Sequence, residues 1–469
     1  MTTESLTAKV AEFAIETPAS AMSEELRELA IRPVIDTIGA IAAGNSGGAG
    51  EKILEYARLQ AMPKSTARRI WTGVHEDTPP EIKALASSAL AHALDFDDEM
   101  SGVGHPSAMV VSALLALPQD GPLDGKRFLE SYIIGFETIT KVAKAIGPRH
   151  YKLGWHTTLT GGGFGATVAA CRMLGLDVHQ TRIALGICAT LAGGLQRNFG
   201  TMTKPLHSGL AARNGVLSAQ LAQVGFTAND DILDGAKSFF ALYSADQAKP
   251  EAIDTLGNPW GLEKPGVSLK KFPCCYATHR VIDSIFAIQA EHHVTPDQLE
   301  AIDIVAPTDA TIPLRYPSPD TGLQGKFSMP YVSSAAFLDG AIKLDTFTDE
   351  MVRRDDVRAI MAKVNVREDP KNRPEDPTAV NSSSGTGGFF DVTIRTTSGE
   401  SWTETRHYPT GSPKHPLSWD DSREKFEDCL TAGGRDIASG MEVFDTLAKL
   451  QEVTDLHAVL DRLTAPADR

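Results

Sequence analysis

The stretch from residue 160 to 225 constrains the fold more than any other part of this sequence. It consists largely of Ala, Gly and other small residues with larger apolar residues at helical spacing, as in GGGFGATVAACRMLG and GLAARNGVLSAQLAQ. The spacing indicates helices. Small side chains let the backbones of neighbouring helices approach closely. The stretch therefore predicts a tight helical bundle rather than a sheet with flanking helices.

The helical pattern covers residues 1–265 and then changes. AEFAIET, EELRELAIRPVIDTIGAIAAG and EIKALASSALAHAL carry apolar residues three and four positions apart. Further along, the near-alternating runs LEAIDIVAP and FFDVTIRTTSG predict strands, with helices such as HRVIDSIFAIQAEHH between them. Helical patterns return after the turn-rich PTGSPKHPLS. We expect a mainly α fold with a smaller α/β domain: residues 1–265 plus 410–469 form a large all-helical domain, and residues 266–409 form the small one.

Composition narrows the class of protein. The net charge of −15 argues against binding to nucleic acid or to an anionic membrane. No run of about 18 apolar residues predicts a membrane span, and the N-terminus lacks the basic start of a secretion signal. The five cysteines are few and odd in number and complete no zinc ligand set, which favours reduced thiols in a cytoplasm. The polar RPEDPTAVNSSSGTGG predicts a mobile loop.

The first motif with chemical potential is HALDFDDEMSGVGHPSA, residues 92–108. A predicted helix ends at four acids, Asp95, Asp97, Asp98 and Glu99, and a Gly-containing loop leads to His105. Acids are stabilised at a helix N-terminus, so their place at a C-terminus opposes the helix dipole and indicates a functional site. Solvated acids on a helix end, with His105 in a turn, are the alternative, and the spacing alone leaves both open.

Two further motifs follow in the Ala/Gly-rich region. GWHTTLTGGGFGA contains His156 and a loose dinucleotide fingerprint. No apolar strand precedes it and no acid stands at the expected distance, so we reject NAD binding and interpret the glycines as sites of helix packing or close ligand approach. TMTKPLHSGLAARNG carries Lys204, His207 and Arg213. Lys204 is either a surface residue or a ligand of a carboxylate.

The fourth motif, KKFPCCYATHR, gathers cationic and proton-transfer groups in residues 270–280. We interpret it as part of a pocket for an anionic substrate, with Lys270 as the principal contact, rather than as a metal site or a redox pair. The alternative is a loop entering a helix, with buried Cys275 and Tyr276 and solvated lysines. His279 lies four residues after Cys275, so the two side chains would share a face on a helix.

Taken together, the motifs resemble those of the MmgE/PrpD family. DFDDEMSGVGHPSA, GWHTTLTGGGFGA, KPLHSGLAARNG, KKFPCCYATH and FSMPYVSSAAFLDG stand in the family's order and spacing, so the resemblance covers nearly the whole chain. It implies a large helical domain built from both chain ends, a smaller α/β domain and a homodimer. Members such as 2-methylcitrate dehydratase, cis-aconitate decarboxylase and iminodisuccinate epimerase act on small di- or tricarboxylates, and the resemblance implies no metal and no organic cofactor.

The resemblance also implies pocket positions. These are Asp95, Glu99, His105, His156, Lys204, Lys270 and Tyr331. Two departures set the chain apart from a decarboxylase-like pattern. Cys275 stands where that pattern has a proton-donating histidine, and Glu99 stands where a smaller polar residue is common. Both make cis-aconitate decarboxylation a less favoured expectation.

From these residues we predict proton abstraction next to a carboxylate, which needs a base and a cradle for the developing charge. The predicted function is a 2-methylcitrate-dehydratase-like lyase. An epimerase that uses the Cys275 thiol as a second base is the alternative, and an inactive carboxylate-binding protein is a third possibility. The predicted catalytic residues are His105, His156, Asp95, Lys270 and Cys275. The predicted substrate-binding residues are Glu99, Lys204, His207, Tyr276, His279, Arg280 and Tyr331.

Overall fold

The computed structural model describes residues 5–61, 67–118, 121–373 and 387–463. The chain divides into two compact units. Unit 1 contains residues 1–195, 205–269 and 418–469, and unit 2 contains residues 196–204 and 270–417. Most of the predicted mobile loop, RPEDPTAVNSSSGTGG, lies outside the described residues. The predicted domains, residues 1–265 plus 410–469 and residues 266–409, stay a prediction.

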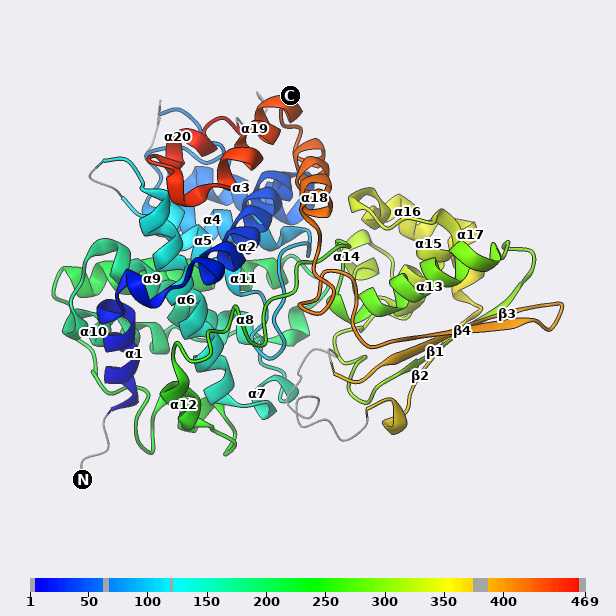
Figure 1. Cartoon of the computed structure of the whole chain (residues 1–469), viewed down its shortest axis with the longest axis horizontal. Helices are drawn as coiled ribbons and strands as arrows, with labels where there is room; N and C mark the ends of the chain where they lie inside the picture. The colour runs from blue at the N-terminus through cyan, green and yellow to red at the C-terminus, as the bar shows by residue number, and fades with distance from the viewer. Residues whose placement is uncertain (1–4, 62–66, 119–120, 374–386, 464–469) are drawn as a thin grey trace. The chain divides into compact units, whose positions relative to one another are not determined.

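Helices joined by loops make up the described part of unit 1, and the Ala/Gly-rich region forms part of its bundle (Figure 1). Its helices are α1 (Leu6–Glu16), α2 (Glu24–Ala43), α3 (Gly48–Gln60), α4 (Pro80–Ala93), α5 (Pro106–Ala116), α6 (Gly125–Ile146), α7 (Arg149–Lys152), α8 (Thr157–Thr160), α9 (Gly162–Leu174), α10 (Val178–Thr190), α11 (Thr203–Gln223, whose first two residues belong to unit 2), α12 (Phe239–Tyr243), α18 (Trp419–Ala432), α19 (Ile437–Leu447) and α20 (Leu456–Leu460).

The core of unit 1 is organised around α5. Almost every residue of this helix is buried, from Pro106 to Ala116, which is typical of a helix that is apolar on all sides. Its neighbours α6 and α9 meet at two glycines: a Cβ atom placed on Gly165 would lie 2.5 Å from the backbone oxygen of Gly135. Helix packing is therefore the role of this glycine, in agreement with the interpretation of the GGGFG run.

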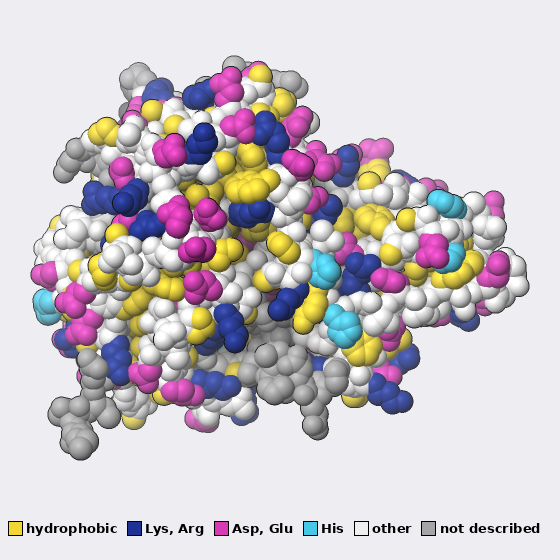
Figure 2. Space-filling model, in the orientation of Figure 1, with side chains coloured by type: hydrophobic (Ala, Val, Ile, Leu, Met, Phe, Trp, Pro, Cys, Tyr) yellow, Lys and Arg dark blue, Asp and Glu magenta, His cyan; other side chains and the backbone are white. Residues whose placement is uncertain are grey.

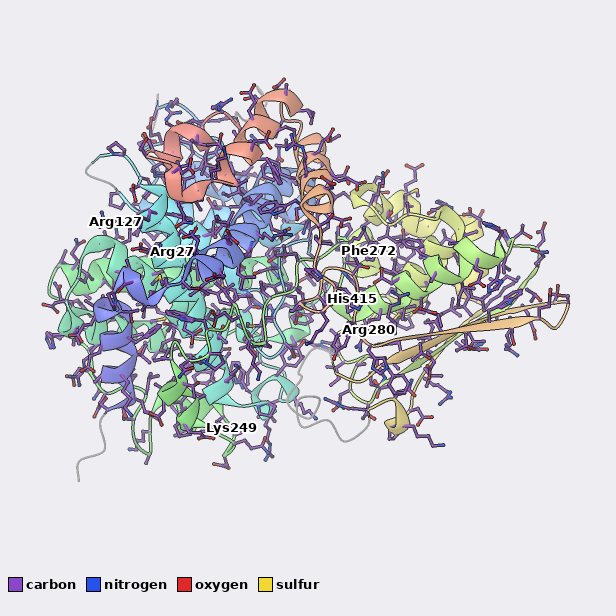
Figure 3. The ribbon with its side chains drawn as sticks, viewed as in Figure 1. Arg27, Arg127, Lys249, Phe272, Arg280 and His415 are labelled. Atoms are coloured by element: carbon purple, nitrogen blue, oxygen red, sulfur yellow. The ribbon has the colours of Figure 1, made fainter. Side chains whose placement is uncertain are left out.

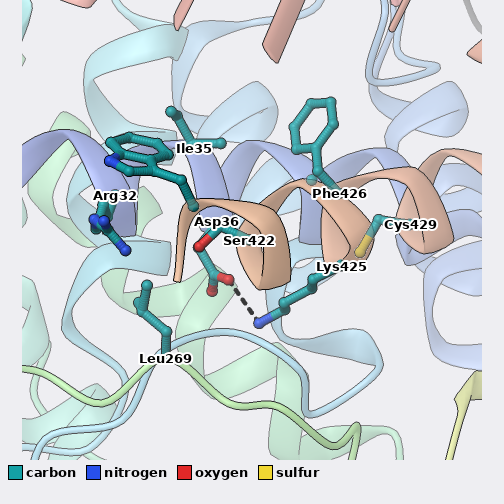
Figure 4. A pocket seen from close by; sticks show the side chains of 10 residues that line it. Arg32, Ile35, Asp36, Leu269, Ser422, Lys425, Phe426 and Cys429 are labelled. Atoms are coloured by element: carbon teal, nitrogen blue, oxygen red, sulfur yellow. Dashed lines mark ion pairs between the residues drawn. The ribbon is translucent and has the colours of Figure 1, made fainter. Parts of the chain in front are cut away.

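The C-terminal helices pack against N-terminal ones. Lys425 of α18 forms an ion pair with Asp36 of α2, with 2.6 Å between Nζ and Oδ1. A pocket beside this pair is shown in Figure 4, and residues of α2, α18 and the segment before unit 2 line it: Arg32, Ile35, Asp36, Gly39, Leu269, Trp419, Ser422, Lys425, Phe426 and Cys429. Arg27, labelled in Figure 3, ties α2 to α6 through Glu130 at 2.9 Å.

Unit 2 is a four-stranded mixed sheet with helices. Its elements are α13 (His279–His292), β1 (Leu299–Ala306), α14 (Gly322–Gly325), α15 (Met329–Asp339), α16 (Asp349–Arg353), α17 (Asp355–Met361), β2 (Val364–Glu368), β3 (Phe390–Thr396) and β4 (Ser401–Arg406). The strand order is β2-β1-β3-β4. β1 pairs parallel to β2 and antiparallel to β3, and Ile302 lies opposite both Val364 and Ile394. Helices α13 and α15 pack against the sheet (Figure 1).

The alternation read from the sequence matches the central strands. In β3 every second residue is buried, from Phe390 to Thr396. The sequence prediction did not include β2 and β4, which form the two edges of the sheet. β2 is partly buried only at Val364 and exposed beyond it, and β4 has no buried residue. Edge strands carry little apolar alternation, so pattern reading misses them. The expected fold class, mainly α with a smaller α/β part, is confirmed.

The surface carries charges of both signs. Figure 2 shows acidic and basic side chains interspersed over the face in view. Among the described residues, no helix combines the length and the apolar character that crossing a membrane requires.

Candidate active site

The loop between α4 and α5 holds the acidic motif, and it is buried. Helix α4 ends at Ala93, and Asp95 then adopts a positive φ of 54°, which non-glycine residues seldom do. This conformation turns the chain so that it leads back to Pro106, the first residue of α5. The exposed fractions of Asp95, Asp97 and His105 are 4%, 0% and 7%. The alternative of solvated acids on a helix end is therefore wrong.

Asp97 bridges two histidines. Its carboxylate lies 2.9 and 3.0 Å from Nδ1 of His92 and 3.5 Å from Nδ1 of His105. Nδ1 of His105 also lies 2.7 Å from the backbone oxygen of Asp98. Because acceptors face both Nδ1 atoms, the hydrogen-bond network assigns the proton of each neutral ring to Nδ1. Nε2 is then the basic atom of each imidazole.

Asp98 contacts the first turn of α5 through its side chain. Its carboxylate accepts hydrogen bonds from the backbone N–H and the hydroxyl of Ser107, and Ser107 also contacts the hydroxyl of Tyr132 at 2.6 Å. Burial raises the pKa of Asp98, and the neighbouring charge of Asp97 adds to that effect, while the bonds from Ser107 oppose it. This acid is part of the support beneath the loop.

A second histidine pair lies beside the first. His156 precedes α8, and its backbone N–H donates to the oxygen of Gly194 at 3.0 Å. His207 lies on α11, and the Nδ1 atoms of His156 and His207 are 2.9 Å apart. The ring of His156 is 6.4 Å from that of His92 and 6.5 Å from that of His105, centroid to centroid. Four buried imidazoles therefore form one continuous cluster in unit 1.

Two histidines and two aspartates in and after the end of α4 offer donor atoms that a metal ion could use. In His92, Asp95, Asp97 and His105, hereafter the His–Asp cluster, one ligand atom from each residue lies within 4.8 Å of the others. Imidazole and carboxylate are the ligands of zinc and similar cations. However, both carboxylate oxygens of Asp97 already face imidazole nitrogens, and a hydrogen-bonded acid–base network accounts for this geometry without a cation.

Other predicted residues of unit 1 are also buried. Glu99 exchanges two backbone hydrogen bonds of 2.8 Å with Ser268, and the residue is 4% exposed.

The ion pair between α2 and α18 also contacts the loop that carries the His–Asp cluster. Lys425 donates to the backbone oxygen of Phe96 in this loop at 2.7 Å. None of the residues that line the pocket beside Asp36 is a predicted site residue.

The remaining predicted residues belong to unit 2. The ammonium group of Lys204 lies over the rings of Phe199 and Phe327, at 5.6 and 5.4 Å. Cys275 packs in a small apolar cluster with the same two phenylalanines and is 9% exposed. Lys270 is 1% exposed. Lys204 and Cys275 thus share apolar neighbours, which the sequence did not reveal.

Tyr276 and His279 lie beside each other. Their ring centroids are 5.1 Å apart, and Nε2 of His279 is 3.3 Å from the backbone oxygen of Cys274. Cys275 precedes a short 3-10 turn and His279 begins α13, so the two are not on one continuous α-helix. The expectation that they share a helical face is wrong, because the chain turns between them.

Arg280 and Tyr331 are held by internal contacts. The guanidinium of Arg280, labelled in Figure 3, donates to the oxygens of Gly387, Gly388 and His407 at 3.0–3.4 Å. It also lies 4.4 Å from the ring centroid of Phe390, and burial lowers its pKa to about 10. The hydroxyl of Tyr331 donates to the backbone oxygen of Thr346, and burial raises its pKa. These contacts stabilise unit 2, and substrate binding by either residue stays a prediction.

Sequence reasoning missed His92 and the bridging role of Asp97. His92 sits inside the first motif, five residues before Asp97 and across the end of α4. Its position on the apolar side of a predicted helix was the available signal, since a buried histidine needs a polar partner.

Comparison with known proteins covers both units. The family models "MmgE/PrpD N-terminal domain" and "MmgE/PrpD C-terminal domain" match residues 8–251 and 272–439. Cis-aconitate decarboxylase of Mus musculus is 30% identical over 92% of this chain and 88% of its own length. The Homo sapiens protein of that name is 28% identical, with 90% and 85% covered. An Aspergillus terreus cis-aconitate decarboxylase is 25% identical, with 98% and 96% covered.

Proposed function

This chain belongs to the MmgE/PrpD family, and we propose that it is a lyase that transfers a proton at a carbon next to a carboxylate of a small tricarboxylate. The observation that carries the proposal is the buried set of imidazoles in unit 1, with Asp97 bridging His92 and His105. Packing of the helices in unit 1 does not by itself require four buried histidines. This set supplies imidazole groups, which are suited to general acid–base catalysis, at buried positions.

In the proposed mechanism His105 and His156 are the acid and the base. The bonds at Nδ1 of His105 fix its ring and leave Nε2 to take or give a proton. Asp97 stabilises the imidazolium that forms, as a carboxylate behind a catalytic histidine does. Asp95, held in a positive-φ turn beside them, is proposed to orient substrate or ring. Lys204 and Lys270 are proposed as ligands of substrate carboxylates.

Two lyase reactions fit these groups. Loss of water, as in 2-methylcitrate dehydration, needs a base and an acid that protonates the departing hydroxyl. Loss of CO2, the reaction named for the relatives, needs a group that protonates the carbon left behind. The relatives' names favour cis-aconitate as a substrate to test, whereas Cys275 in place of a proton-donating histidine favours dehydration. We rank dehydration first on that residue difference.

Epimerisation is the second candidate, because a thiol at position 275 could be a second base. The packing of Cys275 against Phe199 and Phe327 gives the side chain a structural role as well. A Cys275→Ala variant distinguishes the two: an epimerase would lose at least about a hundredfold in turnover, and a dehydratase would retain most of it.

The deciding experiment is proton NMR in D2O with 2-methylcitrate, citrate, cis-aconitate, iminodisuccinate and malate. Loss of the C–H signal of 2-methylcitrate with collapse of its methyl doublet to the singlet of a methyl group on an alkene, or a new vinyl signal from citrate or malate, would support dehydration. Loss of cis-aconitate with release of CO2 would support decarboxylation, and deuterium exchange with an unchanged skeleton would support epimerisation. No reaction with any tricarboxylate would refute the proposed lyase.

Variants assign the proposed residues. His105→Gln and His156→Gln should each lower kcat by about a hundredfold or more, the usual loss when a proton-transfer group is removed. His292→Gln is the matched control, since His292 lies at the end of α13 against Trp402. Equal activity of all three variants would remove the imidazole cluster from the mechanism.

The resemblance of the motifs also motivates a proposed homodimer. A chain of 50.2 kDa that sediments at twice this mass would support it. A single species at the mass of one chain, at working concentration, would refute it.

A further inference from the structure

The pairing of His156 with His207 has an unusual geometry. The two Nδ1 atoms are 2.9 Å apart, their ring centroids are 5.2 Å apart, and each side chain is 3% exposed. Most histidines that face a partner in this chain face an oxygen, as His105 and His150 do. Here a nitrogen faces a nitrogen of the same chemical kind.

Proton counting limits what this pair can hold. A hydrogen bond between two Nδ1 atoms needs one hydrogen between them, so one ring donates from Nδ1 and the other accepts there and carries its own hydrogen on Nε2. One added proton leaves that bond intact and makes it charge-assisted, which strengthens it. A second added proton would place hydrogens on both facing nitrogens and leave two buried cations side by side.

Charged neighbours adjust the first protonation but do not change this count. The rings of His92 and His105 face His156 from the end of α4 and the start of α5, accompanied by Asp95 and Asp97. On α11, Lys204 precedes His207 by three positions. In general, a neighbouring carboxylate favours the protonated form of an imidazole and a neighbouring ammonium group opposes it. The exclusion of a second proton follows from the 2.9 Å contact itself.

We propose that His156 and His207 act as one proton-storing pair, in which His207 is a positioning residue that shares the proton of His156 and does not bind substrate. This inference rests on the proposed function for its catalytic meaning. At rest His156 carries hydrogen on Nδ1 and His207 on Nε2. When Nε2 of His156 takes a proton from substrate, the shared proton moves to Nδ1 of His207, so the charge resides on His207 and His156 is neutral with hydrogen on Nε2. Return of that proton reverses both transfers.

The first test counts protons without substrate. The full chain is labelled with 15N-histidine, and ring nitrogens are followed from about pH 9 to about pH 5, with His156→Gln and His207→Gln spectra for assignment. The two rings together should take up one proton while the chain stays folded, and in His207→Gln the ring of His156 should take up a whole proton alone. Full imidazolium shifts on both rings of the folded chain would overturn the proposal.

The second test asks whether His207 shares a proton with His156 or only holds the ring of His156 in place. In His207→Asn the side-chain oxygen can stand near the position of Nδ1 and accept the bond from His156, but it cannot hold a proton. We expect an unchanged KM, kcat lower by about tenfold or more, and an altered acidic limb of the kcat–pH profile. Wild-type kcat in this variant would overturn proton sharing, and a rise in KM alone would assign His207 to substrate binding. His292→Asn is the control. Because the proton count needs no substrate, its result stands whether or not the proposed lyase activity is found.

Discussion

A buried histidine that has no part in the proposed mechanism offers a quantitative prediction. His150 lies on α7, 1% exposed, with its ring parallel to that of Trp155 at 5.9 Å. Its Nδ1 is 2.8 Å from the backbone oxygen of Tyr243, while its Nε2 is buried with no hydrogen-bond partner. A protonated ring would bury an N–H without an acceptor. Burial accordingly lowers the pKa of His150 from 6.5 to about 4.

The sign of the pH dependence of the unfolding free energy follows from the protonation of His150 in the folded and in the unfolded chain. Above about pH 7.5 the ring is neutral in both, so it adds no pH dependence. As pH falls below the unfolded pKa, the unfolded chain binds a proton that the folded chain does not, and the free energy of unfolding decreases. One pKa unit is worth about 1.4 kcal/mol. From the two pKa values the loss is about 1.4 kcal/mol at pH 5.5 and about 3 kcal/mol at pH 4, and it levels off at about 3.4 kcal/mol at lower pH.

The assay is urea unfolding of wild type and His150→Asn at about pH 7.5, 6.5 and 5.5, followed by tryptophan fluorescence. Asn keeps a donor near the position of Nδ1 but does not titrate. The variant should be less stable at pH 7.5, because it loses the stack on Trp155, and the gap should narrow by about 1.4 kcal/mol at pH 5.5. His292→Asn is the control, since His292 also stacks on a tryptophan but is 24% exposed. A constant gap, or a folded-state NMR titration of His150 near pH 6.5, would refute the reasoning.

Three other predictions follow from packing and charge. Lys425→Met should lower the free energy of unfolding by about 3–5 kcal/mol, because the carboxylate of Asp36 loses its buried cation, and adding Asp36→Asn should restore part of it in urea unfolding. Gly165→Ala should cost about 1–3 kcal/mol by calorimetry, because its Cβ would overlap the oxygen of Gly135, whereas Gly193→Ala, with no atom closer than 4.0 Å, should cost under about 0.5 kcal/mol. Dialysis against a chelator should leave turnover unchanged, because hydrogen bonds already occupy the His–Asp cluster; a loss reversed by added zinc or manganese would contradict this.

Local patterns in the sequence predicted most of the fold. Apolar residues three and four positions apart mark α2 and α4, and the alternation of FFDVTIRTTSG marks β3. These signals arise because each element buries one side or all sides against a core, and the burial pattern is imprinted on consecutive residues. The edge strands β2 and β4 bury little, so no such imprint exists and only pairing with β1 and β3 makes them strands.

In the candidate site, too, some residues could be predicted from the sequence and others could not. Residue type and motif pointed to His105 and His156, because histidine is a common general acid or base and both residues fall on pocket positions of the resemblance. The partners of these rings were not readable, since His207 lies 51 residues from His156 in the chain and the distance between their nitrogens depends on how α8 and α11 pack. His92 was hidden for the opposite reason: it lies within the motif but looks like any residue on the inner side of α4.

The sequence by itself thus determined the helical class of unit 1, the strands at the centre of the sheet, and the motifs that placed the chain in its family. These depend on residues near one another in the chain. The tertiary structure alone decided which histidine rings face each other, that Asp97 contacts two histidines, and that Arg280 donates to three backbone oxygens of unit 2. Proton sharing and desolvation depend on distances of a few ångströms between segments remote in sequence, and only packing sets those distances.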